Sequence, residues 1–185
     1  MHQISSVYIA TSLDGYIARK DGSIDWLNEA NSLVPEGEDC GFFAFIDSVD
    51  ALIMGRKTFE NVLSFGQWPY GDTSVIVLSR NTVDIPKELS KTVSCTSEAP
   101  AELSKRLEDQ GAKRFYVDGG MTIQSFLNEG LIRDITITRI PTVIGNGISL
   151  FGELKADIKL KDIATKVYDF GFVQSTYEIE NNIIV

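Results

Sequence analysis

Two adjacent glycines, Gly119 and Gly120, follow an apolar run at residues 115–117 and open a helical pattern that continues to residue 127. A glycine at a strand end lets a ligand approach the backbone closely, and the free N–H groups of a helix N-terminus favour an anion such as a phosphate. A tight turn that serves only the geometry of the chain would use the same residues. The double glycine therefore predicts either a phosphate-binding turn or a simple one.

Cations and a hydroxyl stand at a second strand end. The buried run at residues 51–54 ends at Gly55, and Arg56, Lys57 and Thr58 open the next helical pattern. Helix N-termini disfavour cations unless an anion is bound there. This segment therefore favours a phosphate site over the alternative, in which the cations are solvated and Thr58 caps the helix.

A third apolar run, residues 74–78, ends at Leu78 and is followed by Ser79 and Arg80. Ligands of open α/β sheets bind at the carboxyl ends of the strands, so the three strand ends together predict a nucleotide that contains a diphosphate. The sequence has neither a Walker A motif nor a Gly-x-Gly-x-x-Gly fingerprint. A conventional kinase and a Rossmann dehydrogenase are therefore not expected.

One carboxyl group is placed to exchange protons. Asp39, Phe43 and Ile46 share one face of a helix that we expect at residues 39–47. An apolar wall beside Asp39 would disfavour its charged form and raise its pKa, which suits a proton donor near neutral pH. In the alternative interpretation Asp39 caps the N-terminus of that helix, as acidic residues often do.

Three further residues have both a functional and a structural interpretation. Asp14, which precedes Gly15, could be catalytic, but a simple turn explains it better. Trp26 could stack on a ligand ring or could anchor its loop to the core. Cys40 could line a pocket, whereas a buried and inert thiol is the ordinary role of such a residue.

Composition limits the classes of function. The chain has 185 residues and a net charge of −9, which predicts one domain over residues 1–185 and argues against a nucleic acid partner. Cys40 and Cys95 are far apart and His2 is the single histidine, so no metal site is expected. There is no signal-peptide pattern and no apolar run of membrane-spanning length, so we expect a cytoplasmic protein without membrane contact.

The elements that must position these residues alternate between strands and helices, which predicts an α/β fold. Residues 18–38 form a long loop with a helical turn near Trp26, and residues 159–179 form a hairpin of antiparallel strands. Strands are expected at residues 3–11, 51–54, 74–78, 92–96, 114–117, 134–140, 159–168 and 173–179. Helices are expected at residues 39–47, 58–63, 101–110 and, after the double glycine, 121–128.

These segments together resemble the dihydrofolate reductase superfamily, and within it the branch formed by the reductase domain of bacterial riboflavin biosynthesis. The matching segments are residues 9–18, 24–27, 52–60, 75–80, 117–120 and 140–151. The resemblance implies a three-layer α/β/α fold with a mixed, mostly parallel eight-stranded sheet and an antiparallel C-terminal hairpin. It also implies a homodimer and NADPH as the hydride donor.

The resemblance assigns cofactor-binding roles to the three strand ends and to the first strand with its loop. Arg56, Lys57 and Arg80 would favour the 2′-phosphate of NADPH over NADH, and the double glycine would meet the pyrophosphate. The residues so assigned are Ala10, Ile17, Gly55, Arg56, Lys57, Thr58, Leu78, Ser79, Arg80, Gly119, Gly120, Met121 and Thr122.

The same resemblance places Asp39 at the catalytic acid of folate reductases, Phe43 at the aromatic residue one turn later and Thr138 at the threonine that supports the acid. Trp26, Phe43 and Thr138 are thus the expected substrate contacts. Asp118 departs from the folate reductases, which have glycine there, and residues 141–151 follow the riboflavin branch. No cation cluster for a substrate phosphate is assignable beyond the cofactor residues, which leaves the substrate open.

We therefore expect an NADPH-dependent reductase that acts on a pterin-like or pyrimidine-like small molecule, in folate or riboflavin metabolism. It would be an oxidoreductase of the class that acts on CH–NH or CH–OH donors. The alternative is a non-catalytic NADP(H)-binding or sensor protein, which would keep the glycines and Arg56 but would need no proton donor.

Overall fold

The computed structural model describes residues 4–180, so His2 and Gln3 lie outside the described residues. An eight-stranded sheet has the order β5-β4-β3-β6-β1-β7-β10-β9. Its strands are β1 (Ile4–Thr11), β3 (Ala51–Gly55), β4 (Ser74–Leu78), β5 (Val93–Thr96), β6 (Arg114–Asp118), β7 (Asp134–Arg139), β9 (Leu160–Val167) and β10 (Val173–Ile179). Strand β10 pairs antiparallel with both β7 and β9, and the other paired strands of this sheet are parallel. The predicted mixed, mostly parallel sheet with an antiparallel C-terminal hairpin is confirmed.

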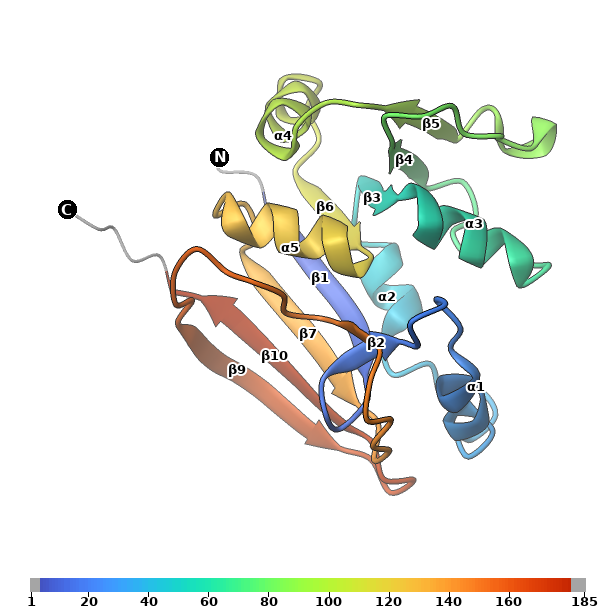
Figure 1. Ribbon diagram of the computed structural model, residues 1–185, viewed down its shortest axis with the longest axis vertical. Coiled ribbons are helices and arrows are strands. Elements are labelled where there is room, and N and C mark those ends of the chain that lie inside the picture. The colour runs from blue at the N-terminus through green and yellow to red at the C-terminus, as the bar shows by residue number, and fades with distance from the viewer. Residues whose placement is uncertain (1–3, 181–185) are drawn as a thin grey trace.

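Helices cover both faces of the sheet, which explains why its parallel strands are apolar on both sides. Ile53 of β3 packs in one buried cluster with Phe126, and its neighbour Met54 packs on the other face with Phe45 and Phe59. Figure 1 shows one layer crossing in front of the sheet, formed by α5 and the segment that leads to β9. The helices are α1 (Asp25–Asn31), α2 (Phe42–Ile46), α3 (Arg56–Ser64), α4 (Pro100–Asp109) and α5 (Gly120–Asn128), with a 3₁₀ turn at Lys87–Leu89.

The sheet splits between β6 and β1 at the carboxyl ends of these strands. Their pairing ends at Ser6 and Tyr116. Beyond that point β1 continues to Thr11 beside β7, whereas β6 continues to Asp118 beside β3. The Tyr116 hydroxyl donates a hydrogen bond of 2.9 Å to the carbonyl oxygen of Tyr8, a group for which β6 supplies no backbone partner. Such a split in the middle of an open α/β sheet is a common place for a ligand.

Some elements differ from the sequence-based expectation. The helix expected at residues 39–47 is the shorter α2, which begins at Phe42, and α1 is a complete short helix within the expected loop. A separate antiparallel pair, β2 (Tyr16–Ala18) with β8 (Ile148–Ser149), was not predicted because three-residue and two-residue strands leave too little pattern to detect.

The outer edge of the sheet is strand β9, whose residues are all exposed. A register shift leaves Ile163 without a paired residue on β10, and such a bulge is a common protection of an edge strand. Within residues 4–180, no helix combines enough length and apolar character to cross a membrane. In the same residues no three histidine, cysteine or acidic side chains gather as ligands for a metal ion.

Candidate active site

The N-termini of α3 and α5 lie next to each other, at the carboxyl ends of the paired strands β3 and β6. Gly55 precedes α3 and Gly119 precedes α5, and each glycine faces a threonine of the other helix. A Cβ atom on Gly119 would overlap Oγ1 of Thr58, and one on Gly55 would lie 3.0 Å from Oγ1 of Thr122. Gly119 also has a φ of 89°, which side chains other than glycine rarely adopt. Gly119 is therefore required by the close approach of the two helix ends, and Gly55 leaves little room for a larger residue.

Hydrogen-bond donors are left free at this junction. Neither α3 nor α5 has a side chain that caps its first N–H groups. The hydroxyls of Thr58 and Thr122 have no hydrogen-bond partner among residues 4–180. Free N–H groups of two helices together with two hydroxyls suit an anion such as a diphosphate. The geometry thus favours the phosphate-binding interpretation of Gly119 over a simple turn.

The predicted cations lie on the β4 side of this junction. Gly55 is paired with Leu78, so Arg56 and Ser79 follow neighbouring strand ends. The Arg56 guanidinium pairs with the Glu60 carboxylate one turn later, at 3.1 Å, and both groups are partly exposed. Lys57 and Arg80 are exposed and have no ion-pair partner among the described residues, while Ser79 Oγ donates to Asn81 O at 2.8 Å.

The other predicted cofactor residues are divided between the split and the core. Ala10 lies in the part of β1 that has no partner on β6. Ile17 on β2 packs against Gly120, where an added Cβ would lie 3.1 Å from Ile17 Cδ1 and 3.0 Å from Ile148 Cγ2. Met121 is 80% exposed at the start of α5. Gly120 is therefore small in order to fit against the β2–β8 pair.

Asp39 does not have the environment that the sequence suggested. Its Oδ1 accepts a hydrogen bond from the Gly41 N–H at 2.8 Å and its Oδ2 accepts one from the Phe43 N–H at 2.9 Å. These bonds stabilise the carboxylate and lower its pKa, so the predicted rise in the pKa of Asp39 is wrong. Phe43 is 63% exposed and forms no apolar wall. The alternative interpretation, a cap for the following helix, describes Asp39 in this structure.

Thr138 is buried, but its hydrogen bond goes to Gln174 rather than to Asp39. The Gln174 Nε2 atom lies 2.9 Å from Thr138 Oγ1, from the Tyr8 hydroxyl and from the carbonyl oxygen of Cys40. The expected support of Asp39 by Thr138 is therefore absent from this structure. Gln174 joins β1, β7 and the loop before α2, and sequence analysis missed it because one glutamine in a terminal strand carries no distinctive pattern.

Trp26, Asp14 and Cys40 have structural roles here. Trp26 is 3% exposed in a cluster with Ile140 and Phe172, so it anchors α1 to the core. Asp14 accepts hydrogen bonds from Ser12 Oγ at 2.6 Å and from two N–H groups of the loop at residues 144–145, which lower its pKa. Cys40 adopts a φ of 54°, its carbonyl oxygen also accepts a hydrogen bond from the Tyr8 hydroxyl, and burial raises the pKa of its thiol.

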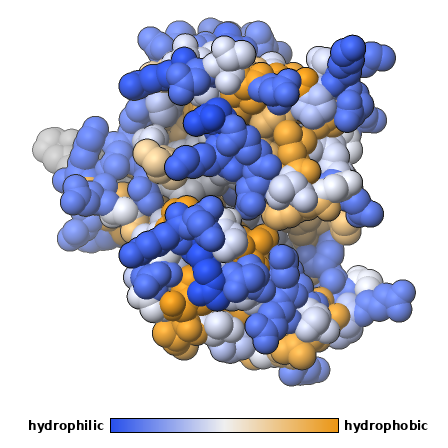
Figure 2. All heavy atoms as spheres, turned by 45° about the vertical axis from the view of Figure 1, so that its right-hand side comes forward, coloured by the Kyte–Doolittle hydropathy of each residue, from blue (hydrophilic) through white to orange (hydrophobic). Residues whose placement is uncertain are grey.

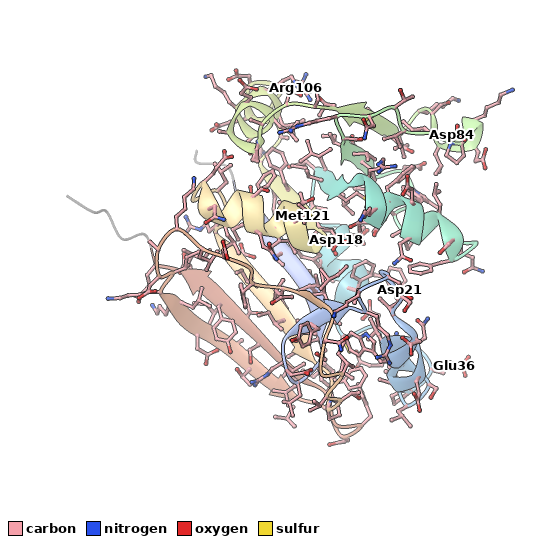
Figure 3. All side chains as sticks on the ribbon, viewed as in Figure 1. Asp21, Glu36, Asp84, Arg106, Asp118 and Met121 are labelled. Atoms are coloured by element: carbon pink, nitrogen blue, oxygen red, sulfur yellow. The ribbon has the colours of Figure 1, made fainter. Side chains whose placement is uncertain are left out.

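Asp118 has the environment that was expected for Asp39. It is the last residue of β6 and shares a face with Tyr116, which packs in the cluster with α2 and α3. Burial raises the pKa of Asp118 to about 6, although the Gly119 N–H, 2.8 Å from Oδ1, and the Tyr116 hydroxyl both lower it. Figure 3 shows Asp118 in the middle of the molecule, beside the N-terminal end of α5. A carboxylate directly before the double glycine was the signal that could have identified it.

A recess crosses the face of the molecule that carries α3 and α1. Figure 2 shows it between the upper and lower halves of that view, with hydrophobic groups along its walls. Phe43 and Met121 are large apolar side chains that remain mostly exposed. An opening with apolar walls and a few polar groups suits a small organic ligand.

Comparison with known proteins identifies relatives over nearly the whole chain. The family model described as the RibD C-terminal domain matches residues 6–173. The uncharacterized protein YwjB of Bacillus subtilis is 36% identical over 91% of this chain and 94% of its own length. A crystal structure from Shewanella sp. PV-4, described as a riboflavin biosynthesis protein, has a TM-score of 0.90 and 39% identity, and covers 97% of this chain and all of its own.

Dihydrofolate reductase from Enterococcus faecalis, solved as a complex with NADP(H), has a TM-score of 0.64 over 96% of this chain and 97% of its own, at 16% identity. That likeness confirms the dihydrofolate reductase-like fold. The matched residues 6–173 include both helix N-termini and the split between β1 and β6, and they end at the first residue of β10. This chain belongs to the RibD C-terminal domain family.

Proposed function

We propose that this protein is an NADPH-dependent reductase that transfers a hydride to a C=N or C=O bond of a small pyrimidine-like or pterin-like heterocycle. The single observation that carries the proposal is the junction of α3 and α5. There Gly55 and Gly119 each face a threonine of the other helix, and no side chain caps either N-terminus. The cofactor would supply the hydride, and a relative of the same fold binds NADP(H).

The cofactor fits the chain in three parts. The pyrophosphate would meet the N-termini of α3 and α5, with the hydroxyls of Thr58 and Thr122. The adenine-side phosphate would lie toward Arg56, Lys57 and Arg80, beyond the ends of β3 and β4. The nicotinamide would enter the split between β1 and β6. The residues we propose for cofactor binding are Ala10, Ile17, Gly55, Arg56, Lys57, Thr58, Leu78, Ser79, Arg80, Gly119, Gly120, Met121 and Thr122.

The substrate would lie on the face of the sheet that α1 and α2 cover. Phe43 is free to contact a ring because it is 63% exposed, while Trp26 and Thr138 would shape the site from within the core. The acid–threonine pair of folate reductases is not formed, because the Thr138 hydroxyl is hydrogen-bonded to the Gln174 side chain instead. This favours a pyrimidine of the riboflavin pathway, such as 5-amino-6-(5-phosphoribosylamino)uracil, over dihydrofolate. Asp39 remains a proposed catalytic acid, if its capping bonds break when substrate binds.

The deciding experiment measures NADPH oxidation with dihydrofolate, dihydropterins and 5-amino-6-(5-phosphoribosylamino)uracil. We expect turnover with the pyrimidine. Arg56→Ala should weaken NADPH binding at least tenfold more than NADH binding, because a hydrogen bond to a charged group contributes about 1.5–3 kcal/mol. Equal losses for the two cofactors would remove Arg56 from the 2′-phosphate site.

A non-catalytic NADP(H)-binding protein, such as a sensor, is the second candidate. The observation in its favour is Asp39, whose carboxylate is held in its charged form by two N–H groups. In this alternative, the protein binds NADPH, and the bound NADPH is not oxidised with any heterocycle tested. We also propose a cytoplasmic homodimer, which light scattering on the purified protein would test.

A further inference from the structure

Gln174 belongs to a row of residues that crosses the sheet beside the proposed site. Along this row Ala10 of β1 is paired with Thr138 of β7, which is paired in turn with Gln174 of β10. Paired residues of neighbouring strands point to the same face of a sheet. Tyr8, two residues before Ala10, packs with α2 and α3, so the whole row lies on the face that carries α1 and α2. Gln174 is therefore a direct neighbour of Thr138, a proposed substrate contact.

The Gln174 carboxamide joins three parts of the chain. Its Nε2 atom lies 2.9 Å from the Tyr8 hydroxyl, from Thr138 Oγ1 and from the carbonyl oxygen of Cys40, which belong to β1, β7 and the segment before α2. A carboxamide nitrogen carries two hydrogens that can serve these acceptors, whereas an aliphatic side chain or a carboxylate at this position would offer none. On the other side of the carboxamide, the Tyr168 hydroxyl lies 3.5 Å from Oε1. We call Gln174, Tyr8, Thr138 and the Cys40 carbonyl the Gln174 cluster.

The Cys40 carbonyl lies in a constrained turn. Cys40 has a φ of 54° and Gly41 has a φ of 84°, so two successive residues are in the left-handed region just before α2. A residue with a side chain is rare in that region and remains there only where its surroundings hold it. Here Gln174 Nε2 and the Tyr8 hydroxyl both donate to the carbonyl oxygen. Tyr8 also packs against Gly41, where an added Cβ would lie 3.3 Å from the hydroxyl, so Gln174 and Tyr8 together fix this turn.

The turn sets the position of α2. This helix has five residues, which is too short to be stable without contacts to the rest of the fold. The ring of Tyr8 supplies such contacts, since it stacks on Phe45 at 4.7 Å between centroids and is tilted against Phe42 at 6.0 Å. Phe43 lies between those two residues in the chain, is mostly exposed and is a proposed substrate contact. A turn released from Gln174 would therefore move Phe43 relative to the sheet.

We infer that Gln174 is a positioning residue for the heterocyclic substrate. Acting through the Cys40 carbonyl, it holds the turn that presents Phe43, and it thereby determines substrate affinity rather than the rate of hydride transfer. The junction of α3 and α5, where we propose that the pyrophosphate binds, contains no residue of the Gln174 cluster, so cofactor affinity should not depend on Gln174. This inference rests on the proposed reductase function.

The first experiment compares Gln174→Leu with wild type in steady-state NADPH oxidation with 5-amino-6-(5-phosphoribosylamino)uracil. We expect the KM for this pyrimidine to rise roughly tenfold or more and kcat to stay within about threefold, the pattern of a lost contribution to substrate binding. Thr176→Val is the matched control on the same strand and face. It removes a hydroxyl that lies 3.0 Å from Thr136 Oγ1 and leaves the Gln174 cluster intact, so its KM should stay within about twofold of wild type. An unchanged KM in Gln174→Leu, or an equal rise in both variants, overturns the inference.

Gln174→Glu adds a signature that a merely structural role would not give, and it also serves if the leucine variant does not fold. The introduced carboxylate has no donor, whereas its protonated form donates one O–H to the cluster. Partial burial among oxygen atoms raises the pKa of such a carboxyl above its ordinary value of about 4.3. The KM of Gln174→Glu relative to wild type should therefore fall as pH is lowered from about 8 to about 5.5, while that of Gln174→Leu stays constant. Parallel pH profiles of the two variants contradict the inference.

The ionisable groups around position 174 are common to both variants, so a difference between their pH profiles belongs to the introduced carboxyl. These groups are Tyr8 of β1, Cys40, Asp39 and Glu38 before α2, Lys166 of β9 and Tyr168 after it.

Alkylation of the Cys40 thiol by iodoacetamide tests the turn without any substrate. Cys95→Ser is the background, because Cys95 is the other free cysteine and is exposed. In that background Gln174→Leu should make Cys40 react several-fold faster, and Thr176→Val should leave the rate unchanged. Faster alkylation with an unchanged KM would show that the turn does not position the substrate. If no heterocycle oxidises NADPH, the proposed function fails, and an unchanged alkylation rate would then overturn the role of Gln174 as well.

Discussion

Asp39 and Asp118 lie in two regions of the molecule but have a similar local arrangement of backbone hydrogen bonds. Each accepts hydrogen bonds from backbone N–H groups just after it, and each stands before a helix. The pKa of Asp39 is nevertheless lowered, whereas that of Asp118 is raised to about 6. The difference lies in burial. Two N–H groups serve the carboxylate of Asp39 near the surface, whereas at Asp118 desolvation within the sheet outweighs the Gly119 N–H and the Tyr116 hydroxyl.

The backbone next to the two carboxyls differs as well. Gly119 follows Asp118 with a φ of 89° and faces Thr58 of the neighbouring helix. After Asp39, Cys40 has a φ of 54°, and its carbonyl oxygen is held by Gln174 and Tyr8. The region after Asp118 thus leaves N–H and hydroxyl donors without partners in the described residues, whereas the donors near Asp39 are hydrogen-bonded within the fold. Only the first resembles a site for a ligand.

The largest effect is expected from Gly119→Ala. The substitution forces a left-handed backbone on alanine and an overlap with Thr58 Oγ1. We expect an unfolding free energy lower by about 3 kcal/mol and a loss of NADPH binding of at least a hundredfold. Denaturant unfolding and fluorescence titration measure the two losses.

Gly120→Ala is the control for that substitution. Its φ is ordinary, and its closest new contacts are the ends of two isoleucine side chains, at 3.0 and 3.1 Å, which can shift. We expect less than half of the stability loss of Gly119→Ala. Equal losses in the two variants would mean that the junction of α3 and α5 is no more constrained than the packing beside it.

Asp118→Asn should change how stability depends on pH. The folded-state pKa of about 6 lies above the ordinary 3.8, so the folded protein binds more protons than the unfolded chain between about pH 4 and 6. Wild-type stability from this group therefore falls as pH rises through that window and is constant above it. The unfolding free energy of Asp118→Asn, measured relative to that of wild type, should therefore rise by about 2–3 kcal/mol from pH 4 to pH 7. Parallel pH profiles of the two unfolding free energies would contradict the raised pKa.

Gln174→Leu should destabilise the region around Asp39 without changing the region around Asp118. The leucine removes the amide that lies 2.9 Å from Thr138 Oγ1, the Tyr8 hydroxyl and Cys40 O. We expect a loss of about 2 kcal/mol in unfolding free energy, since partly buried polar groups lose a partner. Gln174→Glu keeps the shape of the side chain and its acceptor but removes the Nε2 donor, so a loss at least as large as that of Gln174→Leu would assign the effect to the donated bonds. NADPH affinity within twofold of wild type in both variants is the further expectation.

The sequence predicted the strands, the sheet and the candidate junction of α3 and α5 because glycines, cations and apolar runs there obey local rules. The roles of Gly119 and Gly55 could be predicted because positions where two backbones approach closely are usually occupied by glycine. The environments of Asp39 and Asp118 were not predictable, because each depends on which backbone N–H groups and which side chains the fold brings near. Gln174 belongs to the last strand and contacts Tyr8 in the first, a separation that no periodicity can reveal.

The smallest effect on stability is expected at Asp39. Asp39→Ala removes the acceptor for the Gly41 and Phe43 N–H groups and should cost about 1 kcal/mol at neutral pH. Asp39→Asn should lower the unfolding free energy by only a few tenths of a kcal/mol, because an asparagine side chain can still cap the helix. The pKa of Asp39 is lowered, so its contribution is present above the unfolded pKa and is lost as pH falls through the folded one. The deficit of the alanine variant should accordingly shrink in acid. If Asp39→Asn keeps its stability and still loses turnover tenfold or more, Asp39 is the catalytic acid and its capping bonds break when substrate binds.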